Sequence, residues 1–149
     1  MEKVLEELTK GKKFKDSQML EIRKGLENGL TKEQVSMYAK PEFDWEQMEQ
    51  IRYGLEDGLS TEQIEMYADP KFDDWQMAEI YSGIKNGLSQ EQIEMFANLK
   101  FDFVQMSEIR QGLEQGLSME QVKMYAKPEF HWEQMDKMRE NLINSKEQK

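Results

Sequence analysis

The sequence has no cysteine, one histidine and three prolines in 149 residues. Without cysteine there is no disulfide bond, thiol nucleophile or cysteine-ligated metal. No apolar run approaches the roughly 20 residues that cross a bilayer, and the charged N-terminal residues are unlike a secretory signal. We therefore expect a cytoplasmic protein that does not bind membranes.

Basic residues are scarce in the middle of the chain. Residues 43–100 hold 13 Asp and Glu against 4 Lys and Arg, a net charge of −9, whereas the rest hold 17 against 16, a net of −1. An acidic surface repels phosphates, so direct binding of nucleic acid is disfavoured and a basic protein partner is favoured. The alternative is a solvated face that only keeps the protein soluble.

A 29-residue repeat runs through the chain without insertions. Its most regular positions hold a phenylalanine, two methionines and two glycines. Repeats of this length are typical of stacked helical arrays. The phenylalanines are Phe14, Phe43, Phe72, Phe101 and Phe130, and the second methionine is Met37, Met66, Met95 or Met124.

Each repeat predicts two helices. In the second repeat, Asp44 is a suitable N-cap for the first helix and Gly58 a suitable stop. Ser60 predicts the start of a second helix that extends to Ala68, just before a proline. Gly54 lies inside the first helix, where glycine costs about 1 kcal/mol relative to alanine, so it indicates close approach of a neighbouring helix.

Apolar residues at helical spacing predict the buried side of each helix. In the first helix of the second repeat, this stripe contains Trp45, Met48, Ile51 and Leu55. Nine of the twelve methionines occupy two repeat positions on such stripes, which favours core packing over a methionine-rich binding surface. Met119 departs from this pattern and is a candidate for exposure.

A single hairpin of short helices cannot bury its apolar sides alone, whereas stacked copies can. The sequence therefore predicts an all-α fold, a right-handed α-solenoid of helix-turn-helix repeats in a single domain over residues 1–149. Its handedness is taken from other helix-hairpin solenoids. We expect an N-terminal cap helix over 1–12, repeats over 14–42, 43–71, 72–100 and 101–129, and a partial capping repeat over 130–145.

The repeat resembles a known group of sequences. The pattern QMxEIRxGLExGL at Gln105–Leu117, with YAxPxF at Tyr67–Phe72, resembles helical repeats in proteins of phages and conjugative elements of Gram-positive gut bacteria. The resemblance covers residues 14–143 and implies a helical repeat array in a mobile-element setting, with no catalytic residues. The architecture is similar to that of tetratricopeptide solenoids, although the repeat is shorter.

Patterns typical of catalytic, cofactor or metal sites are missing, so we expect a protein that is not an enzyme. His131 stands where other repeats have the aspartate that caps the first helix, which favours a variant cap over a general base. The adjacent Asp73 and Asp74 fit a cap and a first-turn acid better than a carboxylate pair. We expect no cofactor and no metal.

Arginine is confined to one repeat position. A position that takes arginine but never lysine indicates a need for the planar, five-donor guanidinium. Predicted acceptors are the glutamate four residues on or the glutamate in the second helix, and an internal structural ladder is favoured over a row of ligand-binding arginines. The four arginines are Arg23, Arg52, Arg110 and Arg139; the acceptors are Glu27, Glu56 and Glu114, or Glu33, Glu62, Glu91 and Glu120.

The third repeat departs most from the others. Tyr81 replaces arginine, Lys85 replaces glutamate, and Trp75 comes one residue later than Trp45, which turns it by about 100° around the helix. Exposed aromatic residues anchor many protein interfaces, but drift within a redundant repeat is an equal alternative. The predicted partner-binding residues are Glu49, Tyr53, Asp57, Glu65, Asp69, Asp73, Asp74, Trp75, Tyr81 and Glu94.

These observations favour a non-enzymatic protein-interaction module that binds a basic protein through its acidic central repeats, as a monomer or an end-to-end dimer. An alternative follows from the resemblance. It is a mobile-element anti-defence inhibitor, of the anti-CRISPR or antirestriction type, that blocks the nucleic-acid groove of a host nuclease. Competition with nucleic acid distinguishes the two.

Overall fold

The computed structural model describes residues 1–147. Within this range every regular element is an α-helix, as the sequence predicted. The chain divides into two compact units, Met1–Met77 and the residues from Ala78 onward. The boundary falls inside helix α6 (Asp74–Lys85).

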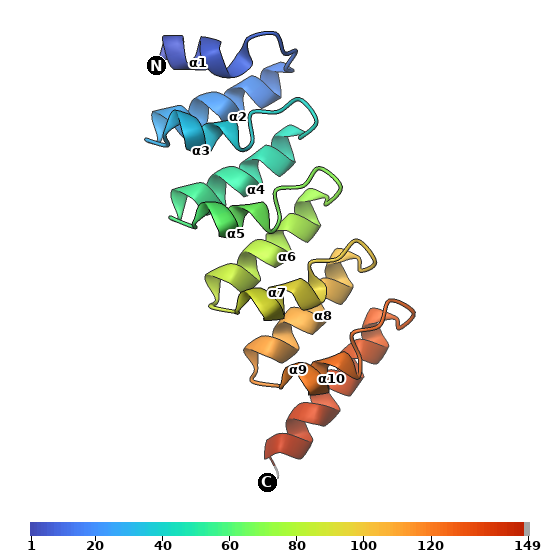
Figure 1. Ribbon diagram of the computed structural model, residues 1–149. Helices are drawn as coiled ribbons and strands as arrows, with labels where there is room; N and C mark the ends of the chain where they lie inside the picture. Colours follow the sequence, from blue (N-terminus) through green and yellow to red (C-terminus); the bar gives the residue numbers. More distant parts are fainter. Residues whose placement is uncertain (148–149) are drawn as a thin grey trace. The chain divides into compact units, whose positions relative to one another are not determined.

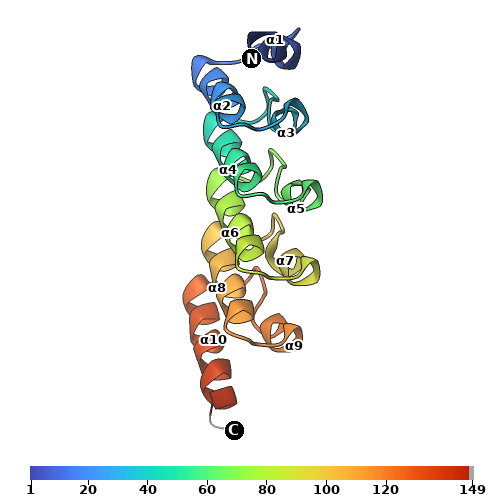
Figure 2. The ribbon, with the colours of Figure 1, turned by 90° about the vertical axis from the view of Figure 1, so that its left-hand side faces the viewer.

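The first unit consists of two layers of helices. The long helices α2 (Asp16–Glu27) and α4 (Trp45–Glu56) pack side by side, and each is followed by a short helix that packs on it. The short helices α3 (Lys32–Ser36) and α5 (Thr61–Glu65) form the second layer (Figures 1 and 2). Helix α1 (Glu2–Thr9) packs on α3.

The second unit uses the same arrangement. The long helices α8 (Phe103–Glu114) and α10 (Trp132–Glu147) pack against each other on one side (Figure 2). The short helices α7 (Gln90–Phe96) and α9 (Met119–Lys123) lie on the other side and pack on α8.

A reciprocal cap marks the start of a long helix, and a glycine in the left-handed conformation marks its end. In α4, Asp44 Oδ1 accepts the Gln47 N–H at 2.8 Å, and Gln47 Oε1 accepts the Asp44 N–H at 2.9 Å. At the other end Gly58 has φ +84°, and the Leu59 N–H donates to Gly54 O at 3.0 Å. This is the predicted glycine-terminated ending. Both predicted ends of this helix are confirmed.

Two predicted helix boundaries were wrong. Helix α5 ends at Glu65 rather than Ala68, because the next two N–H groups bond carbonyls three residues back and tighten the chain into a turn. The N-terminal helix covers Glu2–Thr9 rather than 1–12, and the chain turns after it at Gly11, with φ +73°. Helix α10 continues to Glu147, since Ser145 stands where other repeats have the stop glycine.

The predicted core is correct only in part. Four of the nine methionines assigned to it are buried, Met48, Met77, Met106 and Met135, whereas Met19, Met37, Met66 and Met95 are half-buried. Met48 and Ile51 are fully buried, but Trp45 is 42 % exposed because it lies at the edge of the apolar stripe, on the first residue of α4. Met124 is 54 % exposed, since it follows the short α9 and leaves that helix's buried side. Met119, the candidate for exposure, is half-buried.

The glycine inside each of the long helices α2, α4, α6 and α8 makes room for an aromatic ring. A Cβ on Gly54 would lie 2.2 Å from Tyr67 Oη and 2.8 Å from Ile64 Cδ1. The Tyr67 hydroxyl donates to Gln50 O at 2.9 Å, so it is held at this spot. Close approach of the following segment therefore explains the glycine, as predicted. The same contact joins Gly25 to Tyr38 and Gly112 to Tyr125.

We expect Gly54→Ala to lower the free energy of unfolding by about 1–3 kcal/mol, although alanine is the better helix former, because its methyl group overlaps the Tyr67 hydroxyl. The loss should be smaller in a Tyr67→Phe background, where the hydroxyl is gone. The chain itself places a ring without a hydroxyl, Phe96, against Gly83. Urea unfolding of the double-mutant cycle measures the coupling; equal losses in both backgrounds would contradict this explanation.

Burial raises the pKa of Tyr67 above its usual range. The folded protein therefore holds this proton more tightly than the unfolded chain, whose tyrosine pKa is about 10. Stability should be unaffected below that pH and should decrease above it, by up to about 1.4 kcal/mol per pH unit for each such group. In urea unfolding between neutral and alkaline pH, Tyr67→Phe should show the shallower decrease; parallel curves would rule this out.

Candidate interaction site

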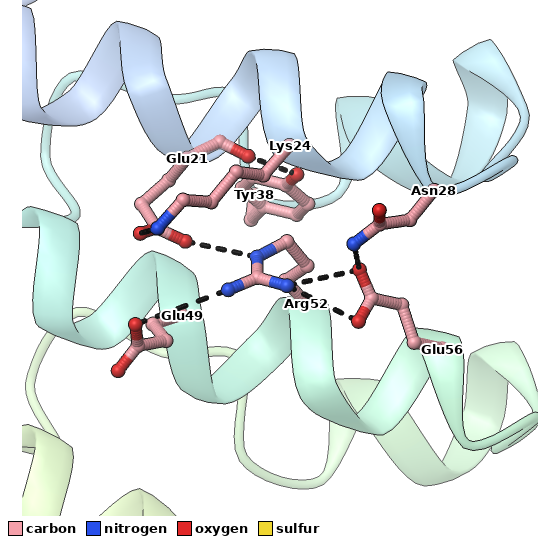
Figure 3. A network of polar contacts seen from close by, with 7 residues as sticks. All are labelled: Glu21, Lys24, Asn28, Tyr38, Glu49, Arg52 and Glu56. Atoms are coloured by element: carbon pink, nitrogen blue, oxygen red, sulfur yellow. Dashed lines mark hydrogen bonds and ion pairs between the residues drawn. The ribbon is translucent and has the colours of Figure 1, made fainter.

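A buried arginine joins the two long helices of the first unit. Arg52 on α4 donates from Nε to Glu21 Oε2 on α2 at 2.9 Å. Its Nη1 donates to both carboxylate oxygens of Glu56 at 3.0 and 3.1 Å, and Nη2 lies 3.8 Å from the Glu49 carboxylate (Figure 3). The Arg52 and Glu21 side chains are 7 % and 2 % exposed. The guanidinium thus bridges two helices with several of its donors.

The surroundings of Arg52 stabilise its charge. Burial alone lowers the pKa of Arg52, but the hydrogen bonds to Glu21 and Glu56 outweigh this effect, so the pKa lies above its usual range. Asn28 Nδ2 also donates to Glu56 Oε1 at 2.7 Å, and Lys24 Nζ lies 3.3 Å from Glu21 Oε1 (Figure 3). The two carboxylates are therefore oriented from both helices.

The same link recurs in the second unit. Arg110 Nε donates to Glu79 Oε2 at 2.8 Å, and its Nη1 to Glu114 Oε1 at 2.6 Å. Arg139 Nε donates to Glu108 Oε2 at 3.1 Å. Burial raises the pKa of Glu108, and the bond to Arg139 offsets only part of this. In each case arginine meets a glutamate 31 residues earlier, on the preceding long helix.

The predicted acceptors were only partly correct. Glu56 and Glu114, four residues after their arginines, accept as predicted. Arg23 is paired with Glu2 at 3.1 Å rather than with Glu27. The second-helix glutamates are exposed and are not the acceptors: Glu33, Glu62, Glu91 and Glu120.

Sequence reasoning missed the acceptors on the preceding long helix, Glu21, Glu79 and Glu108. A signal for them is present in the sequence at a spacing of 31 residues. Where tyrosine replaces arginine, at Tyr81, the residue 31 positions earlier is Gln50 instead of glutamate. Both members of the charge pair change together, which favours a structural role for the arginine position.

A buried glutamine fixes the long helices α2, α4 and α8 to the loop that follows the repeat. Gln47, whose Oε1 caps α4, donates from Nε2 to Pro70 O at 3.0 Å and to Phe72 O at 2.6 Å. Gln18 and Gln105 make the same pair of bonds to their own following loops. One side-chain amide thus caps a helix and binds the following loop at each of these three junctions.

The first unit presents one surface that combines carboxylates with aromatic rings. We define the acidic–aromatic face as Trp45, Glu46, Glu49, Tyr53 and Asp57 on α4, with Asp74 and Trp75 at the start of α6. Tyr53 is 40 % exposed and Trp75 61 %. Five of the predicted partner-binding residues lie here: Glu49, Tyr53, Asp57, Asp74 and Trp75.

Negative charge is concentrated on this face. The carboxylate of Asp74 is the main cause of a raised pKa at Glu46, so the two helices bring like charges together. The Arg52 guanidinium lies 5.0 Å from the centre of the Tyr53 ring, but its donors are directed to Glu21 and Glu56 inside the unit. A cation from outside would relieve the repulsion between these carboxylates.

The other predicted residues lie elsewhere. Glu65 is on α5, in the layer of short helices, and Asp69 accepts the Lys71 N–H in the next turn. Asp73 caps α6 by accepting the Gln76 N–H at 2.8 Å. Tyr81 and Glu94 belong to the second unit, where Tyr81 is half-buried beside Lys85 and Glu94 is exposed on α7.

Two residues of the acidic–aromatic face were missed, Trp45 and Glu46. Trp45 had been assigned to the core stripe. The repeat contains a signal for the exposure of Trp45, because the same position holds Asp16 and Asp74 in other repeats, and aspartate is seldom buried.

Among residues 1–147, no group of three or more His, Asp or Glu is arranged to hold a metal ion, and no helix is both long and apolar enough to cross a bilayer. His131 acts at a helix start, where its Nδ1 accepts the Glu133 N–H at 3.3 Å.

Comparisons with protein-family models, curated proteins and solved structures found no match to this chain. The resemblance to repeats of phages and conjugative elements therefore stays a prediction.

We expect Arg52→Lys to lower the free energy of unfolding by about 1–3 kcal/mol, because one ammonium group cannot reach both Glu21 and Glu56 as the guanidinium does. The matched control is Arg23→Lys, at the same repeat position but with a side chain 41 % exposed, where the loss should stay below about 0.5 kcal/mol. Thermal and urea unfolding measure both. Equal losses would contradict a special role for the buried guanidinium.

Proposed function

We propose that this chain is a right-handed α-solenoid of 29-residue helix-turn-helix repeats that binds a basic protein through its acidic–aromatic face. The repeated bonds support the solenoid. The arginine–glutamate pair recurs at the same spacing in both units, as do the glutamine bonds to the following loop and the tyrosine that packs on a helix glycine.

The observation that carries the binding proposal is the combination of exposed rings with crowded carboxylates on α4 and the start of α6. Large aromatic side chains dominate the affinity of many interfaces, and surrounding charges steer the partner. Trp45 and Trp75 supply the rings, and the paired Glu46 and Asp74 supply repulsion that a lysine or arginine would relieve.

The neighbouring arginine strengthens this proposal. Arg52 is the one basic residue of α4, and its donors are occupied by Glu21 and Glu56. Its Nη2 lies 3.8 Å from Glu49, so this one carboxylate of the face is paired within α4, while the two closest bonds of the guanidinium are made inside the unit. A partner with a basic surface gains the full attraction at low salt, and loses it as salt screens the charges.

The anti-defence alternative uses the same face. Carboxylates held close together, as Glu46 and Asp74 are, present the kind of charge that a nuclease groove accepts from phosphates. Such an inhibitor binds a nuclease in competition with DNA or RNA and stops cleavage, whereas a scaffolding module does neither.

The test captures partners from a bacterial lysate on the tagged chain at low and high salt. One variant changes the proposed face, with Trp45→Ala, Trp75→Ala and Glu49→Lys. The control makes the same kinds of change on exposed residues of the second unit, with Phe103→Ala, Trp132→Ala and Glu94→Lys. Circular dichroism and melting curves establish that both variants fold.

We expect a basic protein that is retained by the wild type and the control, released by salt, and bound at least about tenfold more weakly by the face variant. A partner retained equally by all three proteins would contradict the proposed face. Added nucleic acid then separates the two functions: displacement of a captured nuclease, with inhibited cleavage, supports the anti-defence inhibitor, and undisturbed binding supports the scaffolding module.

A further inference from the structure

Consecutive long helices contact each other through the same set of residues, which we call the template. The template shows what would fit on the side of α2 that no preceding long helix covers, and on the side of α10 that covers no following one. In the first unit α2 covers α4, and in the second unit α8 covers α10. Each interface has a buried methionine, an arginine–glutamate pair, and a glutamine that donates to the next loop. These are Met48, Arg52–Glu21 and Gln18, and Met135, Arg139–Glu108 and Gln105.

On α2 the side corresponding to the covered side of α4 is accessible. Met19 is half-buried, whereas its counterpart Met48 is fully buried. The Arg23 side chain is 41 % exposed, against 7 % for Arg52, and is paired with the exposed Glu2. This side of α2 therefore keeps the arginine and the methionine of the template.

On α10 the side corresponding to the covering side of α8 is also accessible. Gln134 is exposed, whereas its counterpart Gln105 is 7 % exposed. Met138 is half-buried, and Ile109, at the same repeat position, is fully buried. This side of α10 therefore keeps the glutamine of the template, with the apolar Met138 at the position of a core isoleucine.

The template implies a specific pairing if a second copy were placed end to end with the first. Continuing the 29-residue spacing, Gln134 of one copy faces the carbonyls of Lys12 and Phe14 in the next. Within one chain each buried arginine meets the residue 31 positions earlier. When the 29-residue register is continued from one copy into the next, the residue at that distance before Arg23 of the next copy is Lys137 of the first. Where Glu21, Glu79 and Glu108 accept an arginine, Lys137 repels one.

We propose that Lys137 keeps copies of this chain from stacking end to end. The apolar residues and the glutamine still match, so the charge at residue 137 decides whether the two sides associate. A head-to-tail contact between identical chains does not close on itself and propagates into filaments. One like-charged pair at such an interface is enough to disfavour the contact. The inference rests on helix-to-helix contacts and does not depend on the partner of the acidic–aromatic face.

The test is a charge-exchange cycle at residues 23 and 137, followed by sedimentation velocity over a wide range of protein concentration. Wild type pairs arginine with lysine. Lys137→Glu creates an arginine–glutamate pair and Arg23→Glu a glutamate–lysine pair, whereas the double variant pairs two glutamates. Because Lys137 is exposed and Arg23 half-buried, we expect all four to fold, and circular dichroism verifies this.

We expect both single variants to self-associate at least about tenfold more tightly than the wild type and the double variant, since each has one attractive pair. This pattern alternates in sign, while the net negative charge increases steadily from the wild type to the double variant. General repulsion between copies therefore cannot produce it. Association of the wild type equal to that of the single variants, or no association of either single variant, would overturn the proposal.

Discussion

The structure depends on a glutamine side chain that serves two consecutive repeats. The Oε1 of Gln47 accepts the N–H of the residue that caps α4, while its Nε2 donates to two carbonyls of the next loop. The start of one helix and the path of the chain 25 residues later are therefore fixed by one amide group. Because this amide is buried, leaving either half unpaired would cost free energy, and both repeats must hold their places together.

Much of the fold could be predicted from the sequence because its signals are local. Asp44, Gln47 and Gly58 define α4 through bonds that span only a few residues. Gly54 indicated a close contact because glycine is disfavoured inside a helix, and the structure shows that this contact is with Tyr67. The end of α5 was misplaced because no residue of its last turn marks the change to tighter hydrogen bonds.

The candidate site was harder to predict, because exposure depends on which helix packs where. The apolar character of Trp45 indicated the core, but its place at the edge of the stripe leaves 42 % of it accessible. The acceptor Glu21 was missed because its distance of 31 residues from Arg52 is two residues longer than the repeat. Such an offset appears only when the helices are placed next to each other.

The sequence span of the bonds described above has a consequence for how the protein folds. Tyrosine hydroxyls reach back 17 residues, glutamine amides reach forward 23 and 25, and the arginine–glutamate pairs span 31. Contact order is therefore low, a property of fast-folding domains. The entropy cost of loop closure grows with the length of the loop closed. The length of the loop closed is the same at each repeat, so added repeats lengthen the chain without raising the entropy cost of forming any one junction.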